Sequence, residues 1–432
     1  MSPTILIITP RWPDQSLWGL IGIKFPYLAL TTLASLVPDS CEVKIIDENV
    51  DPVDFDFPAD LVAVSLMTPL APRGYAIADR FRKKGIPVVI GGVHATMAPE
   101  EAARHADAVV VGEGELLWPE VIEDFRTGSL KKRYVRDRFA PLTSLPLPRR
   151  ELLKRGSYLF RNTLQTTRGC PNDCDFCSVS SFYGRTYRFR PVEEVIEEIK
   201  TLKGNLIFFV DDNIIGNRAY ARELFENLKP LKRRWVSQAT LNLTRDRRLL
   251  TLARESGCLG LLVGFESLSQ SILNNLGKTF YRVHQYREAI RILHDQGIGI
   301  QGSFIFGHDD DPPDSFDQVV DFCQDNKMDA VLFSLLTPFP GTRIFDRFLE
   351  EKRLLHFNWD KYDMNHVVFR PKQMTPEALE RRFLGAYKKI YSLPSVVNRL
   401  FKFNRSLFLF VPMNLSMRNA WKKIFRFEGL SG

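Results

Sequence analysis

The chain has 432 residues, of which 44% are hydrophobic and 25% are charged, so it can bury more than a single core usually organises. Its net charge of +8 and pI of about 9.1 permit an acidic partner, either nucleic acid or an anionic membrane surface. No apolar run approaches the roughly eighteen residues that span a bilayer, which excludes a transmembrane helix. Six cysteines are too sparse for a disulfide framework and no secretory signal opens the chain, so we expect a reducing, cytoplasmic setting.

Apolar runs alternate with helical patterns from the first residues onward, at intervals that suit a parallel sheet. Five strands with crossover helices predict a doubly wound, flavodoxin-like α/β domain over residues 1–135. The strands are expected at residues 4–9, 41–47, 61–66, 88–91 and 108–111, and the helices near 27–36, 75–84, 99–105 and 116–126.

Ligands in such a sheet bind beyond the carboxyl ends of the strands, and here these ends are polar or rich in glycine. Glycines at such ends let the backbone approach a bulky ligand closely. His94 is a lone histidine, a residue type that is more often a polar wall or core residue than a metal ligand. The candidate ligand-binding residues of this domain are Ser65, Gly91, Gly92, His94, Gly112, Glu113 and Gly114.

A connection between domains is expected next, because residues 129–150 hold a basic run and several prolines without a sustained apolar period. We place the linker at residues 136–155. The strand-helix rhythm then resumes six times, which predicts an open partial β/α barrel over residues 156–345 and a smaller helical region over 346–432. The six strands are expected at 163–167, 206–210, 235–239, 260–264, 299–306 and 330–335.

Three cysteines with the spacing C-x3-C-x2-C, Cys170, Cys174 and Cys177, follow the first of these strands. Three thiolates on one short loop can hold three irons of a cubane cluster and leave the fourth iron open to a small molecule. Structural zinc is an alternative, but it takes four protein ligands, and no further Cys or His has a suitable spacing nearby. The remaining cysteines are isolated in apolar contexts and are expected to be inert: Cys41, Cys258 and Cys323.

Other barrel strands also end in residues that can contact a charged ligand. Asp212 and Asn213 follow the second strand, Glu266 and Ser267 follow the fourth, and Gly302 lies in the fifth. A turn with a helix cap is the simpler interpretation of the acidic run, and a surface acid is the simpler interpretation of Glu266. Their placement at successive strand ends favours ligand contacts, because these ends meet at one face of a barrel.

The cysteine motif and its setting, Arg-Gly-Cys-Pro before and Phe-Cys-Ser after, resemble the radical S-adenosylmethionine (SAM) enzymes. In that family SAM chelates the open iron, and one electron from the cluster splits it to a 5′-deoxyadenosyl radical. The resemblance implies SAM contacts at Asp212, Asn213 and Glu266, with Ser267 and Gly302 close by.

The glycine-bearing strand ends of the first domain resemble the cobalamin-binding domain that precedes the barrel in many radical SAM enzymes. The resemblance therefore implies three cofactors, a [4Fe-4S] cluster, SAM and cobalamin. The Asp-x-His-x-x-Gly loop, with which other cobalamin proteins supply a histidine to cobalt, is absent.

Segments at 209–217, 277–279, 307–313 and 340–343 resemble the branch that contains the hopanoid methylases and the bacteriochlorophyll side-chain methylases. This branch implies C-methylation of an unactivated carbon in a lipid-like or tetrapyrrole-like substrate, with flavodoxin or ferredoxin as electron donor. Two alternatives stay open. One is a radical enzyme without cobalamin that abstracts hydrogen and then closes a ring or inserts sulfur; the other is a non-catalytic iron-sulfur or cobalamin carrier.

Two basic segments help to decide between nucleic acid and an anionic membrane as the acidic partner. Residues 185–190 interleave arginines with aromatic residues, but one short patch is weak evidence for nucleic acid, so pairing with carboxylates is preferred and no nucleic acid is expected. Residues 398–426 hold seven Lys or Arg and no acid. This tail can lie on the inner face of an anionic membrane, cover the barrel mouth or pack on the core.

Overall fold

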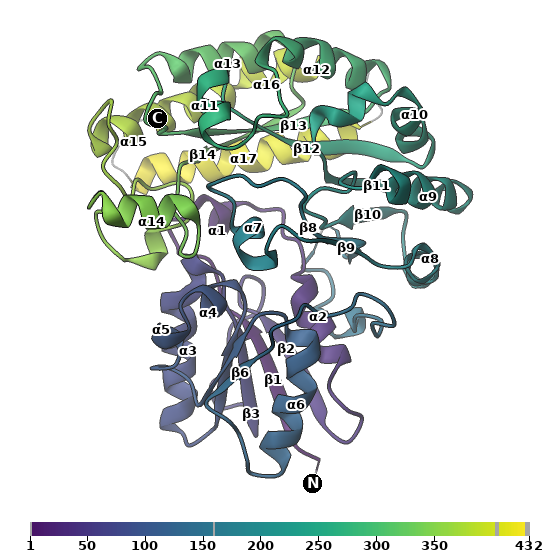
Figure 1. The fold of residues 1–432 in the computed structure, drawn as a ribbon, viewed down its shortest axis with the longest axis vertical. Coiled ribbons are helices and arrows are strands. Elements are labelled where there is room, and N and C mark those ends of the chain that lie inside the picture. The colour runs from purple at the N-terminus through teal and green to yellow at the C-terminus, as the bar shows by residue number, and fades with distance from the viewer. Residues whose placement is uncertain (1, 159, 402–405, 428–432) are drawn as a thin grey trace.

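The computed structural model describes residues 2–158, 160–401 and 406–427. Two α/β units follow one another along the long axis of the molecule, with the N-terminal sheet at one end and a second, larger sheet with its helices at the other (Figure 1). The predicted fold class is confirmed, since a doubly wound sheet is followed by a six-stranded parallel sheet and then by helices.

The first sheet has the strand order β2-β1-β3-β4-β5-β6, and all its pairs are parallel. Its central strands are runs of Val, Ile, Leu and Ala that are buried on both faces, as is typical of parallel sheets. The strands are β1 (Thr4–Thr9), β2 (Glu42–Asp47), β3 (Leu61–Ser65), β4 (Val88–Gly91), β5 (Ala108–Val111) and β6 (Arg133–Val135).

The sixth strand, β6, was not expected. It has three residues and lies in the stretch that the sequence predicts as irregular. Only Tyr134 is buried, between the exposed Arg133 and Val135, so this edge strand has no apolar run that sequence periodicity can detect.

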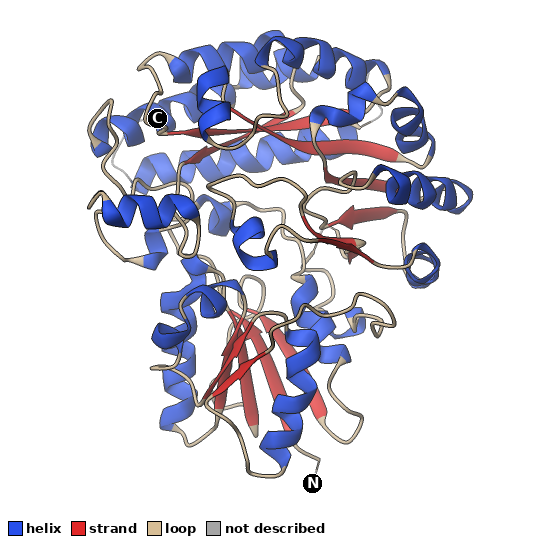
Figure 2. Ribbon diagram, viewed as in Figure 1, coloured by secondary structure: helices blue, strands red, loops and turns tan. Residues whose placement is uncertain are grey.

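Helices cover both faces of the first sheet (Figure 2). The helix α2 (Leu28–Ser35) packs with α6 (Gly114–Arg126) in one core, and α3 (Ala71–Lys83) packs in the core on the opposite face. Shorter helices complete this unit, namely α4 (Val93–Met97), α5 (Pro99–Ala102) and the 3₁₀ turn η1 (Thr68–Leu70). The short helix α1 (Leu17–Leu20) instead packs into the core of the second unit through Leu17.

The second sheet has the order β14-β13-β12-β11-β10-β7 with parallel pairing throughout, so β7 and β14 are its unpaired edges and the barrel is open. The first expected barrel strand is split in two, because the chain leaves β7 and continues as β8, which pairs antiparallel with β9. The strands are β7 (Thr163–Leu164), β8 (Thr167–Gly169), β9 (Tyr187–Phe189), β10 (Leu206–Phe209), β11 (Arg234–Gln238), β12 (Cys258–Glu266), β13 (Gly299–Phe306) and β14 (Ala330–Leu335).

The helices of this unit lie mainly outside the sheet (Figures 1 and 2). The α-helices are α7 (Ser178–Tyr183), α8 (Val192–Thr201), α9 (Arg218–Leu228), α10 (Arg247–Glu255), α11 (Gln270–Asn275), α12 (Tyr286–Asp295), α13 (Ser315–Asp325) and α14 (Arg343–Glu350). The 3₁₀ turns of this unit are η3 (Lys229–Leu231), η4 (Leu241–Arg245) and η5 (Val283–Gln285). Two further 3₁₀ turns, η2 (Arg150–Leu152) and η6 (Trp359–Lys361), pack against the first unit through Leu152 and Trp359.

The chain ends in α15 (Pro376–Ile390), α16 (Leu393–Leu400) and α17 (Leu407–Phe427). The last helix packs directly on the barrel, because a Cβ on Gly260 or Gly299 would lie 2.9 or 2.2 Å from the ring of Phe410. One face of the predicted basic tail is therefore core. In the described part of the chain, no helix is long and apolar enough to cross a membrane.

Candidate active site and cofactor cavities

Two cavities lie on either side of the segment that carries the cysteines. The first, which we call the barrel cavity, has a volume of about 520 Å³ and lies at the carboxyl ends of the barrel strands. The second, the sheet cavity, has a volume of about 340 Å³ and lies at the carboxyl ends of the first sheet. Arg168, Phe182 and Tyr183, which flank the cysteines in sequence, line the sheet cavity, whereas the cysteines themselves line the barrel cavity.

Cys170, Cys174 and Cys177 all reach the barrel cavity as free thiols. Burial raises the pKa of each, to about 12 for Cys174, so binding of iron must displace the protons. In the described residues, no three Cys, His, Asp or Glu side chains converge as a single metal ion requires. Three thiolates are the ligand number of a cubane cluster with one open iron, whereas structural zinc takes four protein ligands.

The cysteine loop is held from outside by Arg343. Its Nη1 donates to Asp173 Oδ1 at 2.9 Å, its Nη2 donates to the Asp173 carbonyl at 2.8 Å, and its Nε donates to Asp175 Oδ1 at 2.9 Å. Gly277 approaches the same loop so closely that a Cβ there would lie 2.8 Å from the Asp173 carbonyl. Two of the segments that resemble the methylase branch, 277–279 and 340–343, thus support the loop, a role that sequence alone did not assign.

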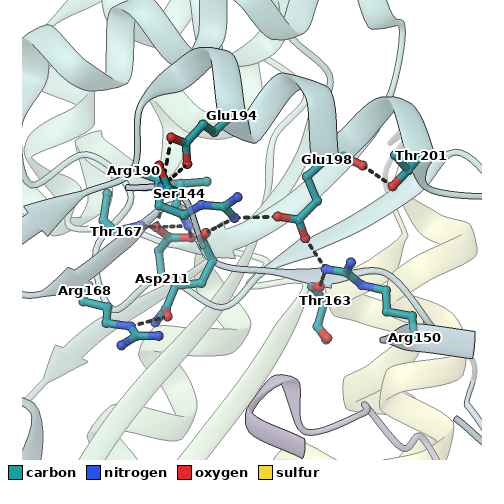
Figure 3. Close-up of polar contacts among 12 residues, drawn as sticks. Ser144, Arg150, Thr163, Thr167, Arg168, Arg190, Glu194, Glu198, Thr201 and Asp211 are labelled. Atoms are coloured by element: carbon teal, nitrogen blue, oxygen red, sulfur yellow. Dashed lines mark hydrogen bonds and ion pairs between the residues drawn. The ribbon is translucent and has the colours of Figure 1, made fainter. Parts of the chain in front are cut away.

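Asp211, Asp212 and Asn213 have different roles in the structure (Figure 3 shows Asp211 with its partner Thr167). Asp211 is fully buried and accepts hydrogen bonds from the backbone and hydroxyl groups of Thr166 and Thr167, so it shapes the strand before the cysteines. Asp212 and Asn213 line the barrel cavity. The Asn213 Oδ1 is buried without a hydrogen-bond partner in the described structure, so this acceptor fits an ammonium donor bound in the cavity.

Asp212 contacts the last residue of β8, directly before Cys170. Its Oδ2 accepts a hydrogen bond from the Gly169 backbone at 3.2 Å. Burial and the neighbouring Asp211 carboxylate raise the pKa of Asp212 to about 7. A carboxyl group that changes charge near neutral pH is therefore present at the edge of the cavity.

Glu266 faces Lys278 in a buried ion pair inside the barrel cavity. Glu266 has φ of +63°, which is uncommon for a residue other than glycine, at a point where the β12–β13 register shifts. Lys278 also donates to the Gly264 carbonyl at 2.7 Å. Burial alone would lower the pKa of Lys278, but the Glu266 carboxylate outweighs it and raises this pKa above its ordinary value. The pair presents both signs of charge beside Cys174, as a zwitterionic ligand requires.

Ser267 and Gly302 do not line the barrel cavity. The Ser267 hydroxyl accepts a hydrogen bond from the Ser269 backbone at 3.1 Å, within the turn that leads into α11. A Cβ on Gly302 would lie 2.6 Å from the sulfur of Met328, so this glycine permits packing behind β13. The alternation of β13 explains the placement, since Ser303 and Ile305 are the residues of this strand that line the cavity.

His94 also lies away from the sheet cavity, fully buried between α3 and η6. Its Nδ1 is 3.3 Å from the Thr68 hydroxyl and its Nε2 is 3.6 Å from a carboxylate oxygen of Glu101. Its ring packs edge-on against Trp359. The structure therefore gives His94 a place in the core, which is the more frequent use of a lone histidine.

The predicted glycines of the first domain do line the sheet cavity, together with Ser65 and Glu113, but they differ in what they permit. Gly92 has φ of +96°, and a Cβ there would lie 2.7 Å from the Leu66 carbonyl, so the loop itself requires this glycine. Gly112 has the same φ and nothing within 4 Å, and a Cβ at Gly91 would only touch Val110. Gly91 and Gly112 thus leave an open cradle that suits the close approach of a bulky ligand.

Glu113 joins the sheet cavity to the cysteine strand. It receives Arg168 Nη1 at 2.9 Å and Arg188 Nη2 at 2.8 Å, and Arg168 also pairs with Glu115. The Glu113 side chain is only 4% exposed. Burial alone would raise the pKa of Glu113, but Arg188 and Arg168 outweigh it and lower this pKa below its ordinary value. We call the side chains of Glu113, Glu115, Arg168 and Arg188 the Glu113 clamp. Arg168 lies two residues before Cys170, so the clamp is close to the cysteine loop in sequence.

A second buried ion-pair group lies behind β8. Glu198, on α8, is fully buried and pairs with both Arg190 and Arg150, which come from the end of β9 and from η2 (Figure 3). The arginines of segment 185–190 thus pair with carboxylates, as the sequence predicts. This group ties the connection between the two units to the first barrel helix.

Two known protein families match the chain, one over the unit with the barrel cavity and one over the unit with the sheet cavity. The radical SAM superfamily matches residues 164–323, and the B12 binding domain matches residues 20–122. The bacteriochlorophyllide d C-12(1)-methyltransferase of Chlorobaculum tepidum is 33% identical over 407 residues, which cover 91% of this chain and 89% of the relative. The hopanoid C-2 methylase of Rhodopseudomonas palustris is 28% identical over 383 residues, covering 82% and 72%.

A solved structure shares the whole fold. The methyltransferase TsrM from Kitasatospora setae, solved with cobalamin and a [4Fe-4S] cluster, superimposes with a TM-score of 0.72 at 17% identity and covers 99% of this chain and 100% of that one. The chain therefore belongs to the cobalamin-dependent radical SAM methyltransferase family, whose cofactors are a [4Fe-4S] cluster, SAM and cobalamin, in the branch of the bacteriochlorophyllide and hopanoid methylases.

Proposed function

We propose that this enzyme methylates an unactivated carbon of a hydrophobic substrate, lipid-like or tetrapyrrole-like in character. The observation that carries the proposal is the composition of the barrel cavity. One wall holds the three cysteines and the polar residues described above, whereas the remainder is largely apolar. The apolar lining residues include Trp18, Phe176, Phe280, Ile305, Leu332, Leu335, Leu336, Phe339 and Met364.

The protein residues have separate tasks in this proposal. When bound, the cofactors supply the radical that removes a hydrogen atom and the methyl group that replaces it. Cys170, Cys174 and Cys177 hold the cluster. Asn213 offers its free acceptor to the amino group of SAM, with Asp212 beside it, while Glu266 and Lys278 orient the methionyl end. The apolar wall excludes water and holds the substrate carbon in place.

Cobalamin is proposed to occupy the sheet cavity. Gly91 and Gly112 leave open space there, and Ser65, Glu113 and Gly114 complete the polar edge. Gly92 maintains the loop in its left-handed conformation. Because Arg168 lines this cavity and its strand continues into the cysteine loop, the two cofactor sites share one rigid element.

The names of the relatives support the substrate class. Relatives in this branch methylate bacteriochlorophyllide d or hopanoids, and both are hydrophobic polycyclic molecules. We propose that the present substrate shares this character and that a flavodoxin or ferredoxin delivers the two electrons that each turnover consumes, one for the cleavage of SAM and one for the cobalt. We also propose that the enzyme works at the inner face of a membrane, where such substrates gather.

The test is mass spectrometry of lipid and pigment extracts from a host with and without the gene, fed with methyl-labelled methionine. The proposed function requires a hydrophobic product that is heavier by one methylene and carries the label. A product that depends on the gene but lacks the label would support cyclisation or sulfur insertion instead. Purified, reconstituted protein that cleaves no SAM would support a carrier.

A further inference from the structure

The outer face of the last two helices is unusually apolar for exposed surface. Phe401, at the end of α16, is 85% exposed, the highest value among the exposed large hydrophobic side chains of the described structure. Other large side chains on α16 and α17 are between 41% and 59% exposed. The exposed residues are Leu393, Val397, Phe408, Val411, Leu415 and Phe427.

Most of these residues share one face of their helix. In α17, Phe408, Val411 and Leu415 have the spacing i, i+3 and i+7, so they form one stripe opposite the buried Phe410 and Asn414. Lys422 and Arg426 follow Leu415 with the spacing i+7 and i+11, which places them on the same face of the helix. The stripe is thus apolar in its first half and basic in its second.

The two helices are joined through their buried sides. Arg399 of α16 donates to Asn414 Oδ1 of α17 at 2.8 Å, and Asn414 donates to the Asp329 carbonyl at the start of β14 at 2.8 Å. Leu393 and Val397 have the spacing i and i+4 and are exposed. The buried contacts thus fix α16 and α17 relative to each other and to the start of β14, so both sets of exposed apolar residues stand on a rigid base.

A cavity of about 480 Å³ opens between α15 and the basic half of α17. Four cationic residues line it, and none of its described lining residues is acidic. Its remaining wall is mostly aromatic, and the buried indole Nε1 of Trp421 has no hydrogen-bond partner in the described structure. We call it the tail cavity; its lining residues are Tyr387, Lys388, Tyr391, Ser392, Arg418, Trp421, Lys422, Phe425 and Arg426.

We propose that the surface of α16 and α17 binds an anionic membrane and that the tail cavity takes the phosphate of a lipid headgroup. Clustered Lys and Arg attract anionic headgroups, and an indole N–H with an apolar ring suits the boundary between headgroups and acyl chains. The neighbouring apolar stripe can enter the same boundary. A soluble phosphate would use the cations but leave the exposed apolar residues in water, so the combination favours a lipid.

The membrane surface would lie close to the substrate entrance. Ser416 of α17 accepts a hydrogen bond from the Gly22 backbone at 2.9 Å, just after α1. Trp18 of α1 lines the barrel cavity. A hydrophobic substrate that leaves the bilayer at α17 would thus meet the wall of the proposed reaction site, which gives this surface a role in substrate delivery.

The experiment is co-sedimentation of the full-length holoenzyme with phosphatidylcholine vesicles, prepared with and without phosphatidylglycerol. We expect binding only to the anionic vesicles and a decrease with salt. The double substitution Lys422→Gln/Arg426→Gln should weaken partitioning roughly 30-fold, because two basic side chains near the bilayer are lost. Arg247→Gln/Arg248→Gln, the same charge change on exposed positions of α10, should leave partitioning unchanged.

A second pair of variants separates the apolar contribution. Val411→Ser/Leu415→Ser should weaken vesicle binding, whereas Leu349→Ser, at an exposed position of α14, should not. Trp421→Phe keeps the ring against Tyr387 and removes the N–H. It should weaken binding to the anionic vesicles, because the headgroup phosphate loses one hydrogen-bond donor.

Three outcomes would overturn the proposal. These are equal sedimentation of the wild type and the Lys422→Gln/Arg426→Gln variant, binding to neutral vesicles alone, and saturation of the tail cavity by inorganic phosphate without vesicle binding. The last would identify a site for a free anion. Vesicle binding is measured without substrate turnover, so its failure and a failure of the proposed methyl transfer are independent results.

Discussion

The three cysteines are the residues on which the whole site depends. Each of Cys170→Ala, Cys174→Ala and Cys177→Ala removes one thiolate from a set that has no spare ligand, since the other free thiols are buried elsewhere. Anaerobic reconstitution should give about four irons per wild-type chain and far fewer in each variant, with loss of SAM cleavage. Cys258→Ala should keep both iron and cleavage; full iron content in a triple cysteine variant would contradict the assignment.

Asp212 makes the stability of the apoprotein depend on pH. Its pKa of about 7 in the fold lies above the value of about 4 in an unfolded chain, so the folded state retains a proton that the unfolded state loses. The stabilisation from this proton is complete below pH ~4 and is lost as pH rises through 7. Asp212→Asn mimics the protonated form, so its advantage over the wild type should grow to ~4 kcal/mol by pH ~8.

Urea unfolding of the apoprotein across this pH range measures the effect. Asp39→Asn, at an exposed position, is the control and should follow the wild type. An advantage of Asp212→Asn that is the same at every pH would show that the Asp212 carboxyl stays charged in the fold.

Sequence alone could predict some residues of the site but not others. Asp212, Asn213 and Glu266 stand at strand ends, and the structure brings them together with the cysteines because parallel strands end on one side. Lys278, Arg168 and Arg343 could not be assigned in this way. Their partners lie up to 170 positions away in sequence, and no local pattern encodes an ion pair that only the fold creates.

At the level of elements, sequence periodicity located the strands with long apolar runs. The bounds of β1, β4, β5, β13 and β14 are those expected. It missed β6, which buries one side chain, and it merged β7 with β8, where the chain changes partners within three residues. Hydrogen bonding to a neighbouring strand defines β6 and separates β7 from β8. Which neighbour a strand pairs with depends on the fold and not on the residues of the segment alone.

The Glu113 clamp is one of the links between the two units, because it joins α6 and the residue before it to β8 and β9. Glu113→Gln leaves Arg188 without its carboxylate partner and Arg168 with Glu115 alone in a buried site, so the free energy of unfolding should fall by about 3 kcal/mol. Iron content should persist, because no cysteine changes, while cobalamin binding weakens. Glu194→Gln, which alters a contact with the Ser144 backbone on the exposed side of α8, is the matched control and should change stability by less than about 0.5 kcal/mol.

Unfolding curves and corrinoid absorbance measure both effects of Glu113→Gln. A double-mutant cycle with Arg188→Met gives the coupling energy directly. Wild-type stability and corrinoid content in Glu113→Gln would show that the clamp holds neither the interface nor the cavity.

The whole molecule has two cavities, one on either side of the segment that carries the cysteines. If the proposed function holds, each product requires one SAM that becomes S-adenosylhomocysteine and a second that becomes 5′-deoxyadenosine and methionine. The first depends on the sheet cavity and the second on the barrel cavity, so a blocked sheet cavity should uncouple them.

Gly91→Leu should produce this uncoupling. A Cβ at Gly91 only touches Val110, so the larger side chain can extend into the sheet cavity without displacing the backbone. The variant should keep its iron and still form 5′-deoxyadenosine, but it should lose corrinoid and form neither S-adenosylhomocysteine nor methylated product. Gly385→Leu, with open space around its position on α15, should behave as wild type. Retention of methyl transfer by corrinoid-free Gly91→Leu protein would place the methyl donor outside the sheet cavity, and parallel loss of 5′-deoxyadenosine would show that the two cavities do not act separately.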